Sequence, residues 1–139
     1  MARNDEEEIS TLEEVAARAG YSVEVKSRQA GEPELADQFR WIAGHLATMR
    51  DKTPAERRRR RQEMSKHTKE LSDVVRAKHI QYGLLPFRCN DEYDKCVRKQ
   101  KKRRKSFYLC YLALYICLAN SMTSLLAAIA LAKAGGHLG

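Results

Sequence analysis

The sequence predicts an all-α protein in which a small helical hairpin region precedes one long C-terminal helix that spans the membrane once. Two observations favour this fold class. Residues 107–132 contain no charged side chain, and residues 98–105, directly before them, form the densest basic cluster of the 139-residue chain. An apolar run of about 18 residues or more is long enough to cross a bilayer as a helix. A helix also satisfies its own backbone hydrogen bonds, which lipid cannot do.

The N-terminal region, residues 1–32, predicts an acidic arm with a short helix and an extended segment. Ser10 and Glu13 match a capping box, apolar residues follow at helical spacing, and Gly20 is typical of a helix end. We therefore expect a helix over residues 11–19. Residues 21–25 alternate with period two, which indicates extended chain.

The next region, residues 33–83, predicts an antiparallel hairpin of two helices. Pro33 suits the first position of a helix, where its missing N–H has no intrahelical partner to lose. Apolar residues then recur at coiled-coil-like spacing: Leu35, Phe39, Ile42, Leu46 and Met49. Thr53 and Glu56 form a second start signal around Pro54, and Gly83 is expected to end the second helix.

A run of arginines occupies the start of that second helix: Arg57, Arg58, Arg59, Arg60 and Arg61. Cations near a helix N-terminus oppose the helix dipole, and consecutive residues point to all sides of a helix. We expect the run to contact an anionic partner, which is an acidic protein surface, a phosphate or the chain's own acidic residues 5–8. A solvated charged helix is the plainer interpretation.

Trp41 lies off the apolar seam of the first hairpin helix, on an otherwise polar face. Exposed tryptophans are frequent anchors of protein interfaces. Trp41 is therefore a candidate contact for a soluble partner. Packing against a neighbouring helix of the same chain is the alternative.

After a connector over residues 84–90, one continuous helix is expected over residues 91–134, with the transmembrane span at about 107–132 and a short tail at 135–139. Basic residues precede the span, and the positive-inside rule then puts the N-terminal domain on the cytoplasmic or matrix side. These residues are expected to contact anionic lipid headgroups such as cardiolipin. They are Arg98, Lys99, Lys101, Lys102, Arg103, Arg104 and Lys105.

The predicted span carries small and polar residues on one side: Ala113, Cys117, Asn120, Ser124 and Ala128. Helices associate in lipid through close packing of small residues and through interhelical hydrogen bonds. This face predicts packing against a helix of another membrane subunit. An anchor whose small residues are incidental is the alternative.

The four cysteines are Cys89, Cys96, Cys110 and Cys117. They form no Cys-x-x-Cys pair, and no nearby histidine completes a zinc pattern. We expect four reduced thiols without a catalytic role, which suits the reducing side of a membrane.

No nucleophile, carboxylate pair or glycine-rich phosphate loop predicts catalysis, and no cofactor or metal is expected. The sequence instead predicts a non-catalytic, tail-anchored accessory or assembly subunit of a multi-subunit membrane complex. The mitochondrial inner membrane, with a complex of the respiratory or ATP synthase type, is preferred over the endoplasmic reticulum. The alternatives are a membrane-tethered nucleic-acid-binding protein, which is less favoured because no aromatics interleave the arginines, and a free tail-anchored adaptor or trafficking protein.

Overall fold

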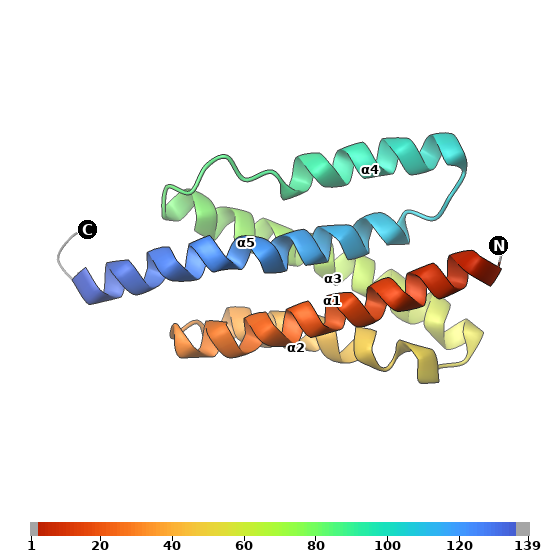
Figure 1. Ribbon diagram of the computed structural model, residues 1–139, viewed down its shortest axis with the longest axis horizontal. Helices are drawn as coiled ribbons and strands as arrows, with labels where there is room; N and C mark the ends of the chain where they lie inside the picture. Colours follow the sequence, from red (N-terminus) through yellow and green to blue (C-terminus); the bar gives the residue numbers. More distant parts are fainter. Residues whose placement is uncertain (1–2, 136–139) are drawn as a thin grey trace.

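The computed structural model describes residues 3–135, and within them the chain forms five α-helices, a short 3-10 helix and no strand (Figure 1). Helices α1, α3 and α5 begin at one end of the molecule, while α2 and α4 run back toward it. The bounds are Arg3–Gln29 for α1, Pro33–Ala47 for α2, Met49–Asp51 for the 3-10 helix η1, Pro54–Gln81 for α3, Cys89–Arg103 for α4 and Tyr108–Gly135 for α5.

The capping residues of α3 act as their sequence predicts. Thr53 Oγ1 accepts a hydrogen bond from the Glu56 N–H at 3.2 Å, and Pro54 is the first helical residue. At the other end Gly83 adopts a positive φ of 68°, and the Leu84 N–H donates to the His79 carbonyl at 2.8 Å. A left-handed residue of this kind closes a helix because it returns the chain to the last free carbonyls.

The N-terminal region differs from the expectation of a short helix and an extended segment. Residues 3–29 form one helix, and neither Gly20 nor residues 21–25 interrupt it. Its buried positions recur every three or four residues: Ile9, Glu13, Ala16, Gly20, Val23 and Ser27. Only Ile9 and Val23 of this stripe are large apolar side chains, so the helical period is hidden in the sequence. Ser10 and Glu13 lie inside the helix and do not cap it.

Gly20 has a packing role instead of a helix-ending one. A Cβ atom at this position would overlap the Tyr115 hydroxyl of α5 and lie 2.9 Å from the Ala43 Cβ of α2. The missing side chain therefore allows α1, α2 and α5 to approach one another closely. Tyr115 uses the space to donate a hydrogen bond from its hydroxyl to the Phe39 carbonyl at 2.7 Å.

Helix α2 packs chiefly on α1 and contacts α3 much less, so residues 33–83 are not a self-contained hairpin. The seam predicted for α2 is nevertheless its core face, and every residue of it is buried: Leu35, Phe39, Ile42, Leu46 and Met49. The hairpin prediction named the correct face but the wrong principal neighbour.

The expected single helix over residues 91–134 is two helices that fold back on each other. Helix α4 ends at Arg103, Arg104 takes a left-handed conformation with φ 56°, and the Lys105 N–H bonds to the Gln100 carbonyl at 3.0 Å. The chain then reverses and α5 runs antiparallel to α4 (Figure 1). Of the tail expected at residues 135–139, residues 136–139 lie outside the described part of the chain.

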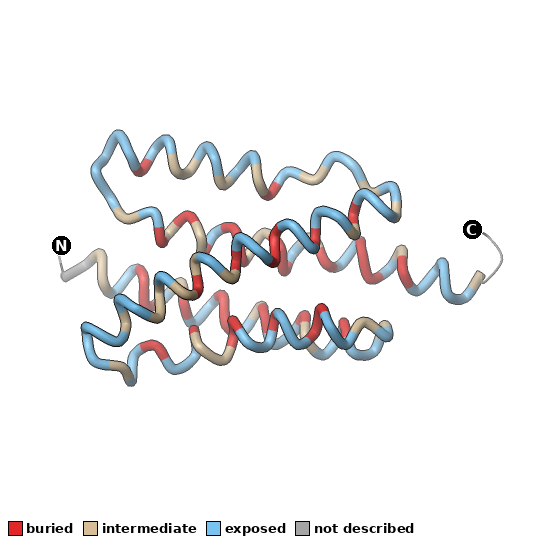
Figure 2. The backbone as a smooth tube through the Cα atoms, turned by 180° about the vertical axis from the view of Figure 1, so that it is seen from behind, coloured by how far each residue is buried: buried red, intermediate tan, exposed pale blue. Residues whose placement is uncertain are grey.

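The prediction of four reduced thiols is wrong in this fold. Cys89 is bonded to Cys117, and Cys96 is bonded to Cys110, with Cα–Cα distances of 5.8 and 5.6 Å. The chain reversal at Arg104 brings together cysteines that a continuous helix would keep apart. Both bonds join α4 to α5. They matter for the position of α4, because only Cys89 and Gln100 of that helix are buried (Figure 2).

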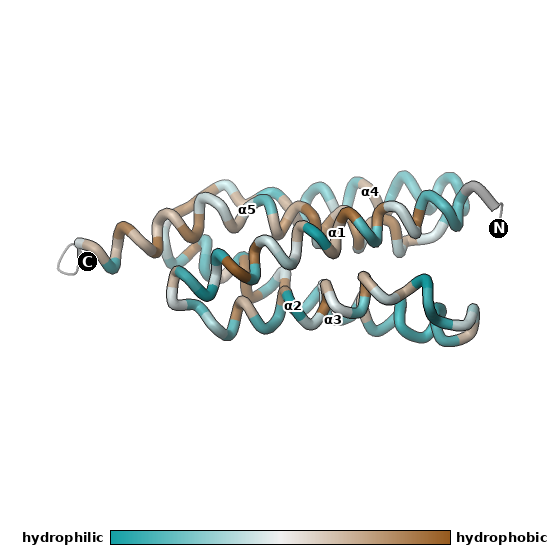
Figure 3. Tube along the Cα trace, turned by 60° about the horizontal axis from the view of Figure 1, so that its bottom comes forward, coloured by the Kyte–Doolittle hydropathy of each residue, from teal (hydrophilic) through white to brown (hydrophobic). Residues whose placement is uncertain are grey.

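Helix α5 is long and apolar enough to cross a membrane, and half of its most apolar window is buried inside the molecule. Its large side chains face α1 and α3, including Leu118, Met122, Leu125 and Ile129. Figure 3 shows hydrophobic α5 beside hydrophilic α4. Near its C-terminal end, Lys133 Nζ donates to the Ala30 carbonyl at 2.6 Å. Within the described residues α5 is therefore the central helix of the core.

The close approach at Gly20 can be tested with a matched pair of glycine substitutions in two helices. Gly20→Ala should lower the free energy of unfolding by about 1–3 kcal/mol, because the new methyl group overpacks the contact with Tyr115 and Ala43. Gly44→Ala meets only the Tyr21 hydroxyl at 3.7 Å, and it should raise stability by up to about 1 kcal/mol through helix propensity. Denaturant unfolding followed by circular dichroism measures both. Equal effects would contradict the packing of α1 against α5.

Candidate functional site

Two basic clusters that are far apart in the sequence lie at the same end of the molecule. We call the end at which α1, α3 and α5 begin the basic end (Figure 1). The arginine run occupies the first two turns of α3, and residues 98–105 occupy the last turns of α4 and the loop before α5. All residues predicted to contact lipid headgroups are exposed there: Arg98, Lys99, Lys101, Lys102, Arg103, Arg104 and Lys105.

A buried ion pair ties the three helices together at this end. Arg61 of α3 donates from Nε and Nη2 to the carboxylate of Glu13 in α1, at 3.0 and 2.9 Å. Tyr108 of α5 donates from its hydroxyl to the same carboxylate at 2.6 Å, and its ring lies 5.3 Å from the Arg61 guanidinium carbon. Glu13 is only 1% exposed. Because Arg61 and Tyr108 both donate to it, this buried charge is neutralised and solvated by the protein.

Glu6, also in α1, extends this network toward the surface. Its carboxylate accepts from Arg61 Nη2 at 2.9 Å and Nη1 at 3.2 Å, and from Arg57 Nη1 at 3.4 Å. The hydrogen bonds from Arg61 hold the pKa of Glu6 below its ordinary value of 4.5, with partial burial acting against the shift and the charges of Arg61 and Arg57 adding to it. For Arg61, burial opposes the charge, but the hydrogen bonds that it donates to Glu13 and Glu6 outweigh burial and raise the pKa of Arg61.

The arginine run therefore divides into side chains with different roles. Arg57 and Arg61 contact Glu6, which belongs to the acidic stretch named as one of its three expected partners. Arg60 pairs with Glu63 one turn along α3 at 3.2 Å. Arg58 and Arg59 are exposed. Only part of the run is neutralised by the chain's own carboxylates.

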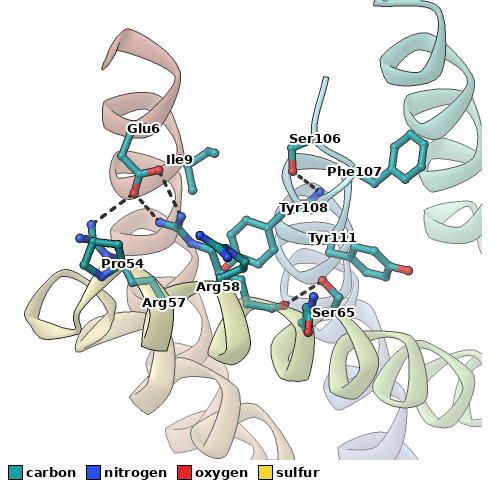
Figure 4. A pocket seen from close by; sticks show the side chains of 12 residues that line it. Glu6, Ile9, Pro54, Arg57, Arg58, Ser65, Ser106, Phe107, Tyr108 and Tyr111 are labelled. Carbon is teal, nitrogen blue, oxygen red and sulfur yellow. Dashed lines mark hydrogen bonds and ion pairs between the residues drawn. The ribbon is translucent and has the colours of Figure 1, made fainter. Parts of the chain in front are cut away.

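A groove of about 680 Å³ opens beside this network, between the beginnings of α1, α3 and α5 (Figure 4). Arg57, Arg58 and Arg61 line one side, and Phe107, Tyr108 and Tyr111 line the other. The groove combines guanidinium groups with aromatic surface. Such a lining suits an anion that carries an apolar portion.

The residues predicted to pack against another membrane helix lie along α5. Ala113, Asn120 and Ser124 are exposed and Ala128 is half-buried. Cys117 is bonded to Cys89 of α4. The buried large apolar side chains of α5, such as Leu118, Met122 and Leu125, occupy other positions of the helix.

Trp41 lies where α2 faces α3. Its ring centroid is 4.2 Å from that of His45 and 4.1 Å from that of His67, which belongs to α3. Trp41 is 39% exposed. Packing against a neighbouring helix, the alternative interpretation, is therefore present, and the exposed part of the ring leaves the partner contact as a prediction.

The disulfides are the feature that sequence reasoning missed, although a signal exists. Cys89 and Cys96 are separated by the same spacing as Cys110 and Cys117, and this spacing is close to two turns of a helix. Each pair therefore lies on one side of its own helix. Two antiparallel helices with such pairs can join the first cysteine to the last and the second to the third.

Within residues 3–135, no group of three or more His, Cys, Asp or Glu side chains is arranged to hold a metal ion. The basic end presents guanidinium and ammonium groups, which can attract anions electrostatically. The chain matches no protein-family model, and no curated protein or solved structure is significantly similar to it.

The buried pair predicts unequal effects for two neighbouring glutamates. Glu13→Ala should lower the free energy of unfolding by about 3 kcal/mol or more, because Arg61 loses its buried partner. Glu14→Ala is the control, since Glu14 pairs with Arg50 at 3.1 Å where both side chains are more than half exposed, and it should cost less than about 1 kcal/mol. Thermal or urea unfolding measures both. Similar losses for the two variants would show that Glu13 does not hold the basic end together.

Glu6 predicts an acid dependence of stability. Its pKa is lowered in the folded state, so its contribution is complete above the ordinary pKa and is lost as the pH falls through the folded value. Wild type should exceed Glu6→Gln in free energy of unfolding at pH 7, and the difference should shrink as the pH falls below the ordinary pKa of Glu6 and through its lowered folded value. Urea unfolding of both proteins across this range measures it. A difference that grows on acidification has the opposite sign and would contradict the Glu6–Arg61 contact.

Proposed function

We propose that this protein is a non-catalytic accessory subunit of a multi-subunit assembly at a membrane, with its basic end turned to the anionic membrane surface. The observation that carries the proposal is the placement of two basic clusters, residues 57–61 and residues 98–105, at the same end of the molecule as an exposed aromatic side chain. Phe107 is 44% exposed and belongs to the loop that joins α4 to α5.

Electrostatics supports this orientation. The chain has a formal net charge of +8, and the exposed Lys and Arg side chains of α4 concentrate at this end. Each Lys or Arg near an anionic bilayer contributes about 1 kcal/mol of attraction, which falls off within a Debye length. Several such residues together with an aromatic side chain are sufficient for reversible binding at an interface.

The position of α5 supports a surface location for the disulfide-linked form. The Cys89–Cys117 bond holds α4 along the first turns of α5. A span over residues 107–132 would therefore carry the charged side chains of α4 into the hydrocarbon. Each Lys or Arg at the bilayer centre costs about 2.5–3.5 kcal/mol even on the mildest scale. In the disulfide-linked form, α5 is therefore expected to remain inside the bundle, and the basic end is expected to lie at the lipid headgroups.

A second candidate is the single-pass form of the same accessory subunit, which the length and apolar composition of α5 favour. In this form the α4–α5 disulfides are open and α5 leaves α1 and α3 to cross the bilayer. The N-terminal helices lie on the cytoplasmic or matrix side, and the mitochondrial inner membrane, with its cardiolipin, suits the basic cluster. Ala113, Asn120 and Ser124 would then pack on a helix of a partner subunit.

Alkaline carbonate extraction of native membranes separates the two candidates. The proposed surface-bound subunit should be released into the supernatant, because high pH and dilution remove electrostatic contacts but do not extract a membrane-spanning helix. Retention in the pellet with integral proteins would contradict the surface location and favour the single-pass form. Native electrophoresis in mild detergent tests the assembly itself. Migration as an isolated monomer would contradict the accessory-subunit role in either form.

A further inference from the structure

The groove at the basic end offers more arginine N–H donors than its carboxylates accept. Arg61 uses four of its five N–H donors in hydrogen bonds to Glu13 and Glu6. Arg57 makes one long hydrogen bond, 3.4 Å from Nη1 to Glu6, and its buried Nε has no hydrogen-bond partner among the described residues. Arg58 lines the same groove and forms no ion pair with the described part of the chain.

Aromatic side chains at the start of α5 line the same groove. The rings of Phe107 and Tyr111 point away from Arg57 and Arg58 (Figure 4), Tyr111 packs on Tyr93 of α4 with ring centroids 5.0 Å apart, and Phe107 is the more exposed of the two. A buried N–H without an acceptor costs free energy, so a group that supplies the acceptor gains it on binding. The ligand that satisfies this lining has an anionic head and an apolar remainder.

We propose that this groove binds the phosphate group of an anionic phospholipid, with Arg57 and Arg58 as the phosphate-binding side chains and Phe107 against the apolar part of the lipid. The planar guanidinium fork matches phosphate oxygens with paired hydrogen bonds. A lipid is the source because Phe107 and the exposed basic residues 101–105 adjoin the groove and would meet the same membrane surface. A free phosphate ion would use neither. This inference rests on the proposed surface-bound function.

The network beneath the groove can remain intact when the phosphate binds. Arg57 exchanges its long contact with Glu6 for phosphate oxygens, whereas Glu6 keeps its two shorter contacts with Arg61. Arg61 also keeps Glu13. The two guanidinium groups that take the lipid are thus distinct from the one that joins the helices.

The chain supplies a charge-matched control for the experiment. Arg57→Gln with Arg58→Gln removes two positive charges from the groove. Arg59→Gln with Arg60→Gln removes two from the next positions of α3, which do not line it. Full-length proteins are tested for co-sedimentation with phosphatidylcholine vesicles containing or lacking cardiolipin. We expect the groove variant to bind cardiolipin vesicles at least about tenfold more weakly than the control, because it loses charge-assisted hydrogen bonds as well as charge.

Thermal unfolding of the two variants should be similar, because each loses one partly exposed ion pair, Arg57–Glu6 or Arg60–Glu63, and this similarity excludes misfolding as the cause of a difference in binding. Sodium phosphate should displace wild type from the vesicles more than sodium chloride of equal ionic strength. Equal losses by the two variants, or displacement that depends on ionic strength alone, would overturn the groove site and leave membrane-surface binding standing. Failure of wild type to bind cardiolipin vesicles while it retains an RNA oligonucleotide would overturn both the lipid site and the surface-bound function.

Discussion

Two disulfide bonds fix the charged helix α4 against the apolar helix α5, and the rest of the structure depends on this constraint. Helix α4 buries almost no apolar side chain, so apolar packing contributes little to holding it against the bundle. The bonds Cys89–Cys117 and Cys96–Cys110 hold it there. They thereby place a charged surface along the first half of α5, whose opposite side is covered by α1 and α3.

The same arrangement places the two basic clusters at one end of the molecule. The arginines of residues 57–61 have different roles there. Arg61 is an internal residue that neutralises Glu13 and joins α1, α3 and α5. Arg57 and Arg58 face the groove with donors to spare. The arginine run, residues 57–61, opposes the dipole of α3. One of its members stabilises the packing of the helices, and others present positive charge at the surface. Internal neutralisation also explains how the first turns of α3 remain helical despite consecutive cations.

Local signals in the sequence predict the helices whose ends are set locally. Thr53, Pro54 and Glu56 mark the start of α3, Gly83 marks its end, and the apolar seam of α2 marks its core face. The full length of α1 is not predicted by local signals, because its buried stripe includes Glu13 and Gly20. Their suitability for the core comes from Arg61 and Tyr115, which lie far along the chain.

The long-range features could not be predicted for a related reason. An uncharged run satisfies a bilayer and a protein core equally well, so the composition of α5 does not identify which of the two surrounds it. The surroundings are set by the reversal at Arg104, where no Gly or Pro signals a break. Once the chain turns there, the equal cysteine spacings pair and the two basic clusters converge. The groove forms where the start of α5 lies beside the first turns of α1 and α3, which are far from it in the sequence.

Disulfide mapping of the native protein tests the position of α5 most directly. Free thiols are blocked in intact cells or membranes, the protein is digested without reductant, and the linked peptides are identified by mass spectrometry. The bundle predicts peptides joining Cys89 to Cys117 and Cys96 to Cys110. Four blocked thiols, or bonds to other proteins, would contradict the placement of α4 on α5 and the surface-bound form that follows from it.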